Sequence, residues 1–193
     1  MSQAAPIADR QEIILHAAFQ AFATYGYRRT SMDDIAQGCG MSRTALYLHY
    51  RNKEDIFRSL AMRYFEEAAL NMKAELNRPG QSLKQALYSC FVAKDGKFME
   101  VVLTTPHGTE LLDAGFSVSG DLAMAGEAGM ALLLAGWLQE KGLPPDLGSA
   151  SDFAETVVHA LKGLKSSAKS LEALRAGEDR LAGLIAKVLT VRS

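Results

Sequence analysis

Residues 31–57, SMDDIAQGCGMSRTALYLHYRNKEDIF, contain the pattern that decides the fold. Two short segments flank a turn, with the small Ala36 before it, Gly40 within it and the apolar Leu46 six residues further on. A small side chain lets two helices approach closely, and glycine adopts a turn conformation that a side chain would strain. This spacing predicts a helix-turn-helix.

The second helix of this motif carries donors on its outward positions. Arg43 and Thr44 can reach base edges in a major groove, while the Tyr47 phenol and a Lys53 ammonium can bind phosphate oxygens. Residues 27–53 hold five basic and two acidic side chains, a local charge of +3 in a chain whose net charge is -1. We therefore expect contacts to double-stranded DNA from Thr30, Ser31, Ser42, Arg43, Thr44, Tyr47, His49, Tyr50 and Lys53. For Tyr50 the alternative is that the ring belongs to the core.

The composition indicates a soluble globular protein. The chain has 193 residues, of which 48% are hydrophobic, enough to bury a core. The longest nearly apolar run, residues 128–138, is about half of the roughly 20 residues that a membrane-spanning helix needs. The N-terminus lacks a basic segment followed by an apolar one, and two distant cysteines make no disulfide framework. We expect a cytoplasmic protein without membrane contact.

Apolar residues recur at spacings of three and four through most of the chain, which predicts an all-α fold. One helix is expected over residues 10–24 and a long one over residues 53–77, before the break at Pro79-Gly80. Further breaks at Asp95-Gly96, Thr105-Pro106 and residues 115–120, 142–145 and 168–170 divide the rest into about five helices. We predict two domains: a three-helix DNA-binding domain over residues 1–52 and a larger helical ligand-binding and dimerisation domain over residues 53–193.

The N-terminal region resembles the DNA-binding region of TetR-family regulators. The matching residues are Tyr25-Gly26-Tyr27, Thr30-Ser31, Asp34-Ile35-Ala36, Gly40-Met41-Ser42-Arg43, Leu46-Tyr47, Tyr50 and Asn52-Lys53-Glu54-Asp55. Two positions depart from the family pattern. Ala45 stands where the family often has threonine, with the hydroxyl one residue earlier at Thr44, and Cys39 replaces a small residue before the turn glycine.

This resemblance implies a homodimer that reads a palindromic operator with a recognition helix at about residues 42–49. It also implies a divergent C-terminal body that binds a small effector. We expect a ligand-responsive repressor, with no cofactor and no metal. The alternatives are a ligand-independent DNA-organising protein on the same fold and a transcriptional activator.

The body contains an apolar set rich in aromatic residues and methionine, which is typical of the lining of a hydrophobic ligand site. The alternative is an ordinary helical core. The set comprises Phe91, Phe98, Met99, Val102, Leu103, Met124, Met130, Leu134 and Trp137.

Two apolar stripes near the C-terminus predict a pair of helices, with Ala160 and Gly163 permitting close approach. Two such helices from each subunit would form a four-helix interface. The alternative is packing within one chain. The stripe residues expected in the dimer interface are Phe153, Val157, Leu161, Leu164, Leu181, Ile185 and Val188.

His107, Glu110 and Asp113 share a three-residue spacing, with His159 further along the chain. Such a set could hold a metal or act in acid-base chemistry. Acidic residues in the first turns after Thr105-Pro106 are, however, also what a helix start favours. No nucleophile-base pair or phosphate-binding glycine loop accompanies them, so we expect no enzymatic activity.

Overall fold

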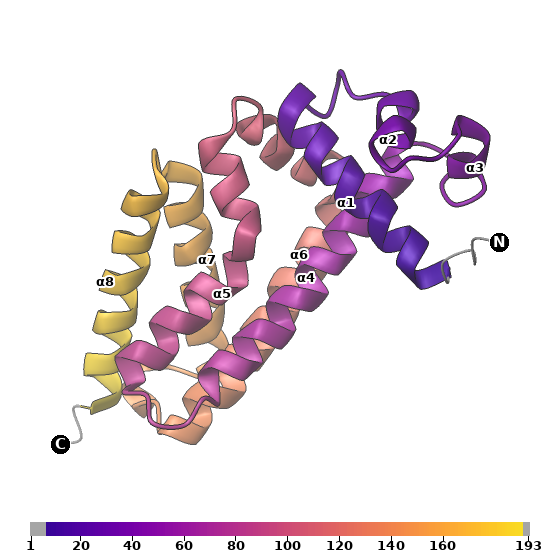
Figure 1. Ribbon diagram of the computed structural model, residues 1–193. Helices are drawn as coiled ribbons and strands as arrows, with labels where there is room; N and C mark the ends of the chain where they lie inside the picture. The colour runs from indigo at the N-terminus through magenta and orange to yellow at the C-terminus, as the bar shows by residue number, and fades with distance from the viewer. Residues whose placement is uncertain (1–6, 191–193) are drawn as a thin grey trace. The chain divides into compact units, whose positions relative to one another are not determined.

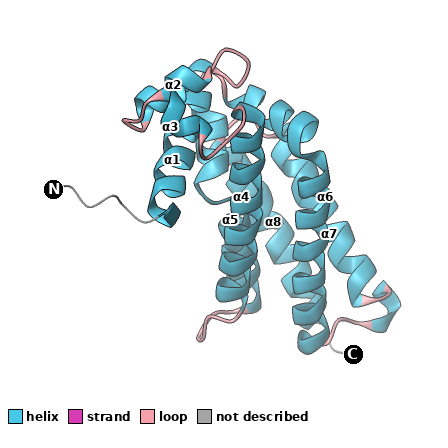
Figure 2. Cartoon of the chain, turned by 90° about the vertical axis from the view of Figure 1, so that its right-hand side faces the viewer, coloured by secondary structure: helices cyan, strands magenta, loops and turns pink. Residues whose placement is uncertain are grey.

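The computed structural model describes residues 7–190, apart from the side chains of residues 7–9, 97 and 116. Within this range the chain forms helices and connecting turns without a strand, which confirms the all-α prediction (Figure 2). The helices labelled in Figure 1 are α1 (Ile7–Tyr25), α2 (Met32–Gly38), α3 (Arg43–Tyr47), α4 (Lys53–Leu76), α5 (Leu83–Thr104), α6 (Gly108–Lys141), α7 (Ala150–Ser167) and α8 (Leu171–Thr190). A short 3-10 turn, Pro145–Leu147, precedes α7.

Two predicted breaks lie inside helices. Gly96, with φ of 51°, interrupts α5, and Ser119, with φ of −133°, interrupts α6. Glycine alone tolerates the first conformation without strain. The segment Ser117–Lys141 of α6 is long and apolar enough to cross a membrane by length and composition alone, a test that helices of soluble proteins also pass. Of the most apolar 18 residues in this segment, 28% are buried within the chain.

The chain divides into two compact units. Met1–Tyr64 and Thr104–Ala123 form the first, and Phe65–Leu103 and Met124–Ser193 form the second. This division runs through α4 and α6, whereas the prediction from sequence placed a single boundary after residue 52. The difference arises because a long helix packs with different neighbours at its two ends, which no local sequence signal marks.

The first unit has a small core built around α1. Ile14, Ala18 and Phe22 are fully buried on one face of this helix. The Phe22 ring lies 5.3 Å from the Tyr27 ring and 5.7 Å from the Phe57 ring between centroids. These contacts join α1, the loop that follows it and the first turns of α4 into one support for α2 and α3.

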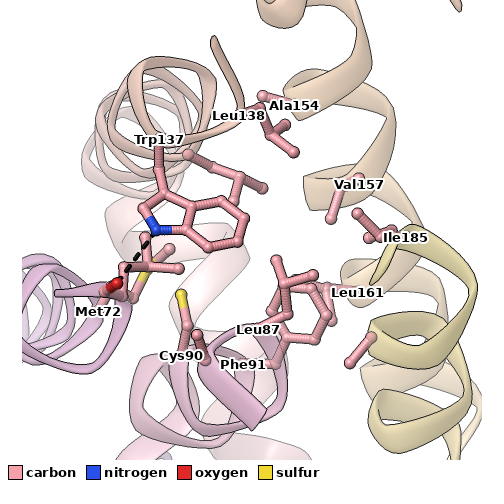
Figure 3. Packing of buried hydrophobic residues seen from close by; sticks show 14 of the residues in the cluster. Met72, Leu87, Cys90, Phe91, Trp137, Leu138, Ala154, Val157, Leu161 and Ile185 are labelled. Atoms are coloured by element: carbon pink, nitrogen blue, oxygen red, sulfur yellow. Dashed lines mark hydrogen bonds between the residues drawn. The ribbon is translucent and has the colours of Figure 1, made fainter. Parts of the chain in front are cut away.

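The second unit has a larger core, contributed by α4 to α8 (Figure 3). Phe91 and Leu134 are fully buried, and Trp137 is 5% exposed. The Trp137 indole N–H donates to the carbonyl of Leu76 at 3.0 Å, so its polar atom is satisfied inside the core. Close packing of this kind leaves few voids.

Five charged side chains gather in the second unit. Lys94 Nζ lies 2.8 Å from Asp95 Oδ1, and Lys165 Nζ lies 3.8 Å from the same oxygen. Glu178, which is 1% exposed, accepts a hydrogen bond from Arg175 at 2.7 Å. Burial and the nearby Asp95 carboxylate together raise the pKa of Glu178 to about 7, against the opposing effect of Arg175.

The Glu178→Gln variant is expected to be more stable than the parent protein at pH 8, by on the order of 2 kcal/mol. The folded state holds the Glu178 proton more tightly than the unfolded chain, whose pKa is about 4.5. The stabilisation from this group is therefore complete below pH 4.5 and is lost as the pH rises through about 7. Urea unfolding at pH 5 and pH 8 checks this. A variant that is less stable than the parent at pH 8 contradicts it.

Candidate DNA-binding site

A capping box begins α2. The Ser31 hydroxyl accepts from the Asp34 backbone N–H at 3.2 Å, and Asp34 Oδ2 accepts from the Ser31 N–H at 2.8 Å. Ser31 also donates its hydroxyl proton to Asp34 Oδ2 at 2.6 Å, and these bonds lower the pKa of the Asp34 carboxyl. Ser31 is exposed, but its hydroxyl is committed to the cap.

The turn between α2 and α3 has the predicted construction. Gly40 has φ of 66°, in the left-handed region, and the Met41 N–H donates to the Ala36 carbonyl at 2.9 Å. Ala36 is 3% exposed, and Ile35 and Leu46 are fully buried. The roles expected of Ala36, Gly40 and Leu46 are therefore confirmed, and the pair of helices forms a helix-turn-helix.

The third helix presents a polar face to solvent. Its N-cap is Ser42, whose hydroxyl accepts from the Ala45 N–H at 3.1 Å and keeps its own proton for another partner. Arg43, Thr44 and Tyr47 are all exposed. With Leu46 pointing inward, the rest of the helix surface is open to a large partner.

Arg43 is held across this face. Its guanidinium lies 2.7 Å from Asp33 Oδ2 and 5.5 Å from the centre of the Tyr47 ring. A hydrogen bond to the Tyr47 oxygen and the charge of the Asp33 carboxylate raise the pKa of Arg43. The ion pair is exposed and therefore easily exchanged, so a phosphate or base edge can compete with Asp33 for the guanidinium.

One further side chain belongs to this surface and was not predicted. Leu48, directly after α3, is 83% exposed. Such an apolar group can contact a thymine methyl. The signal was present in the sequence, because an apolar residue one position after Tyr47 does not share the face of Leu46.

Thr30 does not belong to the exposed site, which corrects the prediction. Its side chain is buried at 1% exposure, and its hydroxyl donates to the carbonyls of Gly26 at 2.7 Å and Ala21 at 3.2 Å. The hydroxyl is used to close the end of α1. Tyr50, at 8% exposure, likewise belongs to the core, the alternative stated for it.

The prediction that Lys53 contacts DNA is also wrong, because its ammonium group faces the protein. Nζ donates to the carbonyls of Tyr27, Arg28 and Thr30 at 2.8, 2.9 and 2.9 Å, which uses all three N–H donors. It also lies 4.9 Å from the centre of the Tyr27 ring. Burial lowers the pKa of Lys53, and Glu110 partly opposes this. Lys53 shapes the loop beneath the motif.

The predicted effector-site residues form a filled core in large part. Phe91, Met99, Val102, Met130, Leu134 and Trp137 are buried, Phe98 and Leu103 are half-buried, and Met124 is 69% exposed. Met124 therefore lies on the surface, contrary to the prediction. Of the two cavities described for the second unit, neither is lined by the set as a whole.

Those two cavities lie near helix ends. One, of about 620 Å³, is lined by residues of the 132–151 stretch such as Leu132, Gly136, Leu143 and Ala150. The other, of about 300 Å³, follows the turn after α4 and includes Trp137 from the predicted set. The prediction missed the first cavity because its walls are mostly glycine, serine and alanine, which give no aromatic signal.

Three predicted interface residues are buried in their own chain. Val157, Leu161 and Ile185 are 2–3% exposed and belong to the core of the second unit (Figure 3). They cannot also form the surface of a dimer, which corrects the prediction. Phe153, Leu164, Leu181 and Val188 are half-buried, and the first three pack against that same core.

The candidate metal or acid-base residues do not form a cluster of that kind. His107 Nδ1 lies 3.9 Å from Glu110 Oε2, and Asp113 is exposed. Across the described part of the chain, no group of three His, Cys, Asp or Glu side chains is placed to hold a metal ion. Glu110 instead accepts a hydrogen bond from the Arg28 backbone N–H at 2.7 Å.

Sequence comparisons point to one family. The sequence pattern of the bacterial regulatory proteins of the TetR family matches residues 14–60. The chain is 35% identical over 79 residues to the transcriptional regulator YezE of Bacillus subtilis and 30% identical over 101 residues to the transcriptional repressor ComR of Escherichia coli. These matches cover 41% and 49% of this chain, and the chain spans 40% and 48% of the length of those two relatives.

Solved structures share the fold along nearly the whole chain. NemR of Escherichia coli in its reduced form superposes with a TM-score of 0.70 at 15% identity, covering 96% of this chain and 100% of that one. The fatty acid degradation regulator FadR of Bacillus halodurans gives 0.69 at 18% identity, covering 96% and 97%. The named relatives are transcriptional regulators, a non-enzymatic class, as predicted. Residues 14–60 therefore carry the DNA-binding region of the TetR family of bacterial regulatory proteins, within a fold that solved regulators share.

Proposed function

We propose that this protein is a cytoplasmic transcriptional repressor that binds a palindromic operator as a homodimer and releases it when a small hydrophobic effector binds. The observation that carries the DNA-binding part is the construction of α3. Its one buried side chain, Leu46, anchors the helix while Arg43, Thr44 and Tyr47 face solvent. A short helix held this way can enter a major groove.

We assign the contacts to DNA by reach and exposure. Arg43 and Thr44 lie on the first turn of α3, where a recognition helix meets base edges. The free hydroxyl proton of Ser42, the Tyr47 phenol and the half-buried His49 face phosphates. Backbone contacts position the helix, whereas base contacts choose the sequence.

A homodimer follows from the small size of this motif. One helix of five residues reads too few bases for a specific site, whereas two copies about 34–36 Å apart read a palindrome. We place the interface on the outward faces of α7 and α8. Ala160 and Gly163 are exposed on α7, and Leu184 is 63% exposed on α8. Small residues beside a large apolar one favour close helix packing between subunits.

We place the effector in the second unit, where the larger cavity has a volume within the usual range of small-molecule sites. Its apolar wall, which includes Leu132, Ala135 and Leu143, favours a hydrophobic compound. An effector acts only if it binds the DNA-free conformation more tightly than the DNA-bound one. Once an operator has been selected from a library of random duplexes, gel shifts with a panel of hydrophobic compounds test whether an effector releases the DNA. Compounds that bind the protein and never change operator affinity contradict the switch.

The Arg43→Ala variant is expected to bind the operator at least tenfold more weakly than the parent protein. Loss of one good base contact costs about 1–3 kcal/mol, and the proposed homodimer loses this contact in both half-sites. The operator is first obtained by selecting bound duplexes from a random library, and a dyad-symmetric site is expected. Fluorescence anisotropy then compares Arg43→Ala with Arg180→Ala, which removes an exposed arginine on α8. Equal affinity of the two variants contradicts the proposed site.

Genome-wide pull-down of bound DNA separates a repressor from a DNA-organising protein on the same fold. A few palindromic sites in promoters support regulation, and hundreds of dispersed sites contradict it. Transcription from those promoters after deletion of the protein distinguishes a repressor from an activator. Expression rises when a repressor is lost and falls when an activator is lost.

A further inference from the structure

The loop between α1 and α2 sets the direction of the helix-turn-helix. Gly26 begins it with φ of 85°, and the Thr30 N–H donates to the Gly26 carbonyl at 3.1 Å. From the side of α4, Lys53 binds three carbonyl groups of this loop. A loop fastened at so many points transmits any displacement to α2, since its backbone has little freedom left.

Glu110, in the first turn of α6, fastens the same loop from another side. Its Oε1 accepts from the Arg28 N–H at 2.7 Å, a bond strengthened by the charge of the carboxylate. Its Oε2 occupies the space beside Gly26, where a Cβ would clash with that oxygen. Because glycine has no Cβ, residue 26 leaves room for the Glu110 carboxylate.

The part of α6 around the interruption at Ser119 is tied to α4. Arg58 binds Asp121 through two nitrogens, at 2.8 and 2.7 Å, and donates to the Val118 carbonyl at 2.8 Å. Residues 104–123 accordingly belong to the same compact unit as the DNA-binding helices, although they are distant in sequence. The stretch continues directly into the part of α6 that belongs to the second unit.

We propose that Glu110 is a positioning residue for operator binding: it holds the α1–α2 loop through the Arg28 amide and the space at Gly26, and so links α6 to the orientation of α2 and α3. The inference rests on the proposed function, since it assigns Glu110 a role in operator binding. Withdrawal of the carboxylate frees the Arg28 N–H and loosens the loop.

The test compares Glu110→Ala, Glu110→Gln and Glu110→Asp with Asp113→Ala, a control on an exposed carboxylate of the same helix. Operator affinity is measured well below the unfolding temperature, together with hydrogen exchange at the Arg28 amide. We expect Glu110→Ala to bind the operator roughly tenfold more weakly and to exchange the Arg28 amide proton faster. Glu110→Gln keeps an oxygen acceptor and is expected within about threefold of the parent protein.

An affinity of Glu110→Ala equal to that of Asp113→Ala overturns the inference. If Glu110→Ala does not fold, Glu110→Asp carries the test, because the shorter side chain draws the carboxylate away from Arg28 while keeping its charge. A parent protein that selects no DNA contradicts the proposed function instead. The two failures are thereby distinguishable.

Discussion

The Phe91→Ala variant is expected to have a free energy of unfolding about 3–5 kcal/mol lower than that of the parent protein. Phe91 is fully buried in α5 and packs in the same core as Leu87, Trp137 and Leu161 (Figure 3). Removing its ring deletes apolar burial and leaves a cavity that the surrounding helices fill only in part. Denaturant unfolding followed by circular dichroism measures the change.

This result separates a packed core from the lining of an empty pocket. A side chain that borders an open cavity has fewer neighbours, so its truncation costs less. The matched control is Met124→Ala, because Met124 comes from the same predicted set but is 69% exposed. We expect its stability to stay within about 0.5 kcal/mol of the parent protein. A Phe91→Ala variant that loses no more than this would restore the pocket interpretation.

The Leu184→Glu variant is expected to convert the proposed homodimer into monomers at micromolar concentration. In a two-fold interface each substitution is present twice, so two uncompensated carboxylates would be buried between subunits. Each buried charge costs several kcal/mol, enough to outweigh a moderate interface. Sedimentation equilibrium measures the mass, and operator affinity is expected to fall with dimerisation.

Leu70→Glu is the control for this experiment. Leu70 is 69% exposed on α4 and lies outside the proposed interface. Its substitution is expected to leave the sedimentation mass unchanged. If Leu70→Glu dissociates the dimer and Leu184→Glu does not, the interface lies on another face of the protein. If the parent protein is itself monomeric, the homodimer proposal is wrong.

Short-range patterns in the sequence were sufficient for the all-α fold and for the helix-turn-helix. Ala36, Gly40 and Leu46 lie within eleven consecutive positions, and each acts on neighbours along the chain. The capping box at Ser31 and Asp34 is equally local. Such features depend on backbone geometry and helical period, and therefore do not require knowledge of the tertiary contacts.

These local patterns do not predict whether a given polar side chain points to solvent or into the protein. The Lys53 ammonium could bind a phosphate, yet it donates to the carbonyls of a loop about 25 residues earlier in the chain. Thr30 has the hydroxyl of a DNA contact and uses it to close α1. Whether a donor faces solvent depends on which acceptors the fold brings within 3 Å, and those acceptors come from other elements.

Local sequence also does not show what covers the apolar faces of the C-terminal helices. Val157 and Ile185 form apolar stripes that would suit a subunit interface, but the stripes fit the core of their own chain. An amphipathic helix shows which of its faces avoids water and carries no mark of the surface that covers it. Glu110 is the clearest case, because its helix start was visible from Pro106 onward, whereas the Arg28 amide and the open space at Gly26 lie some 80 residues away. Local sequence therefore determined which helices form and which faces are apolar, and only the tertiary packing decided what each face and each polar group meets.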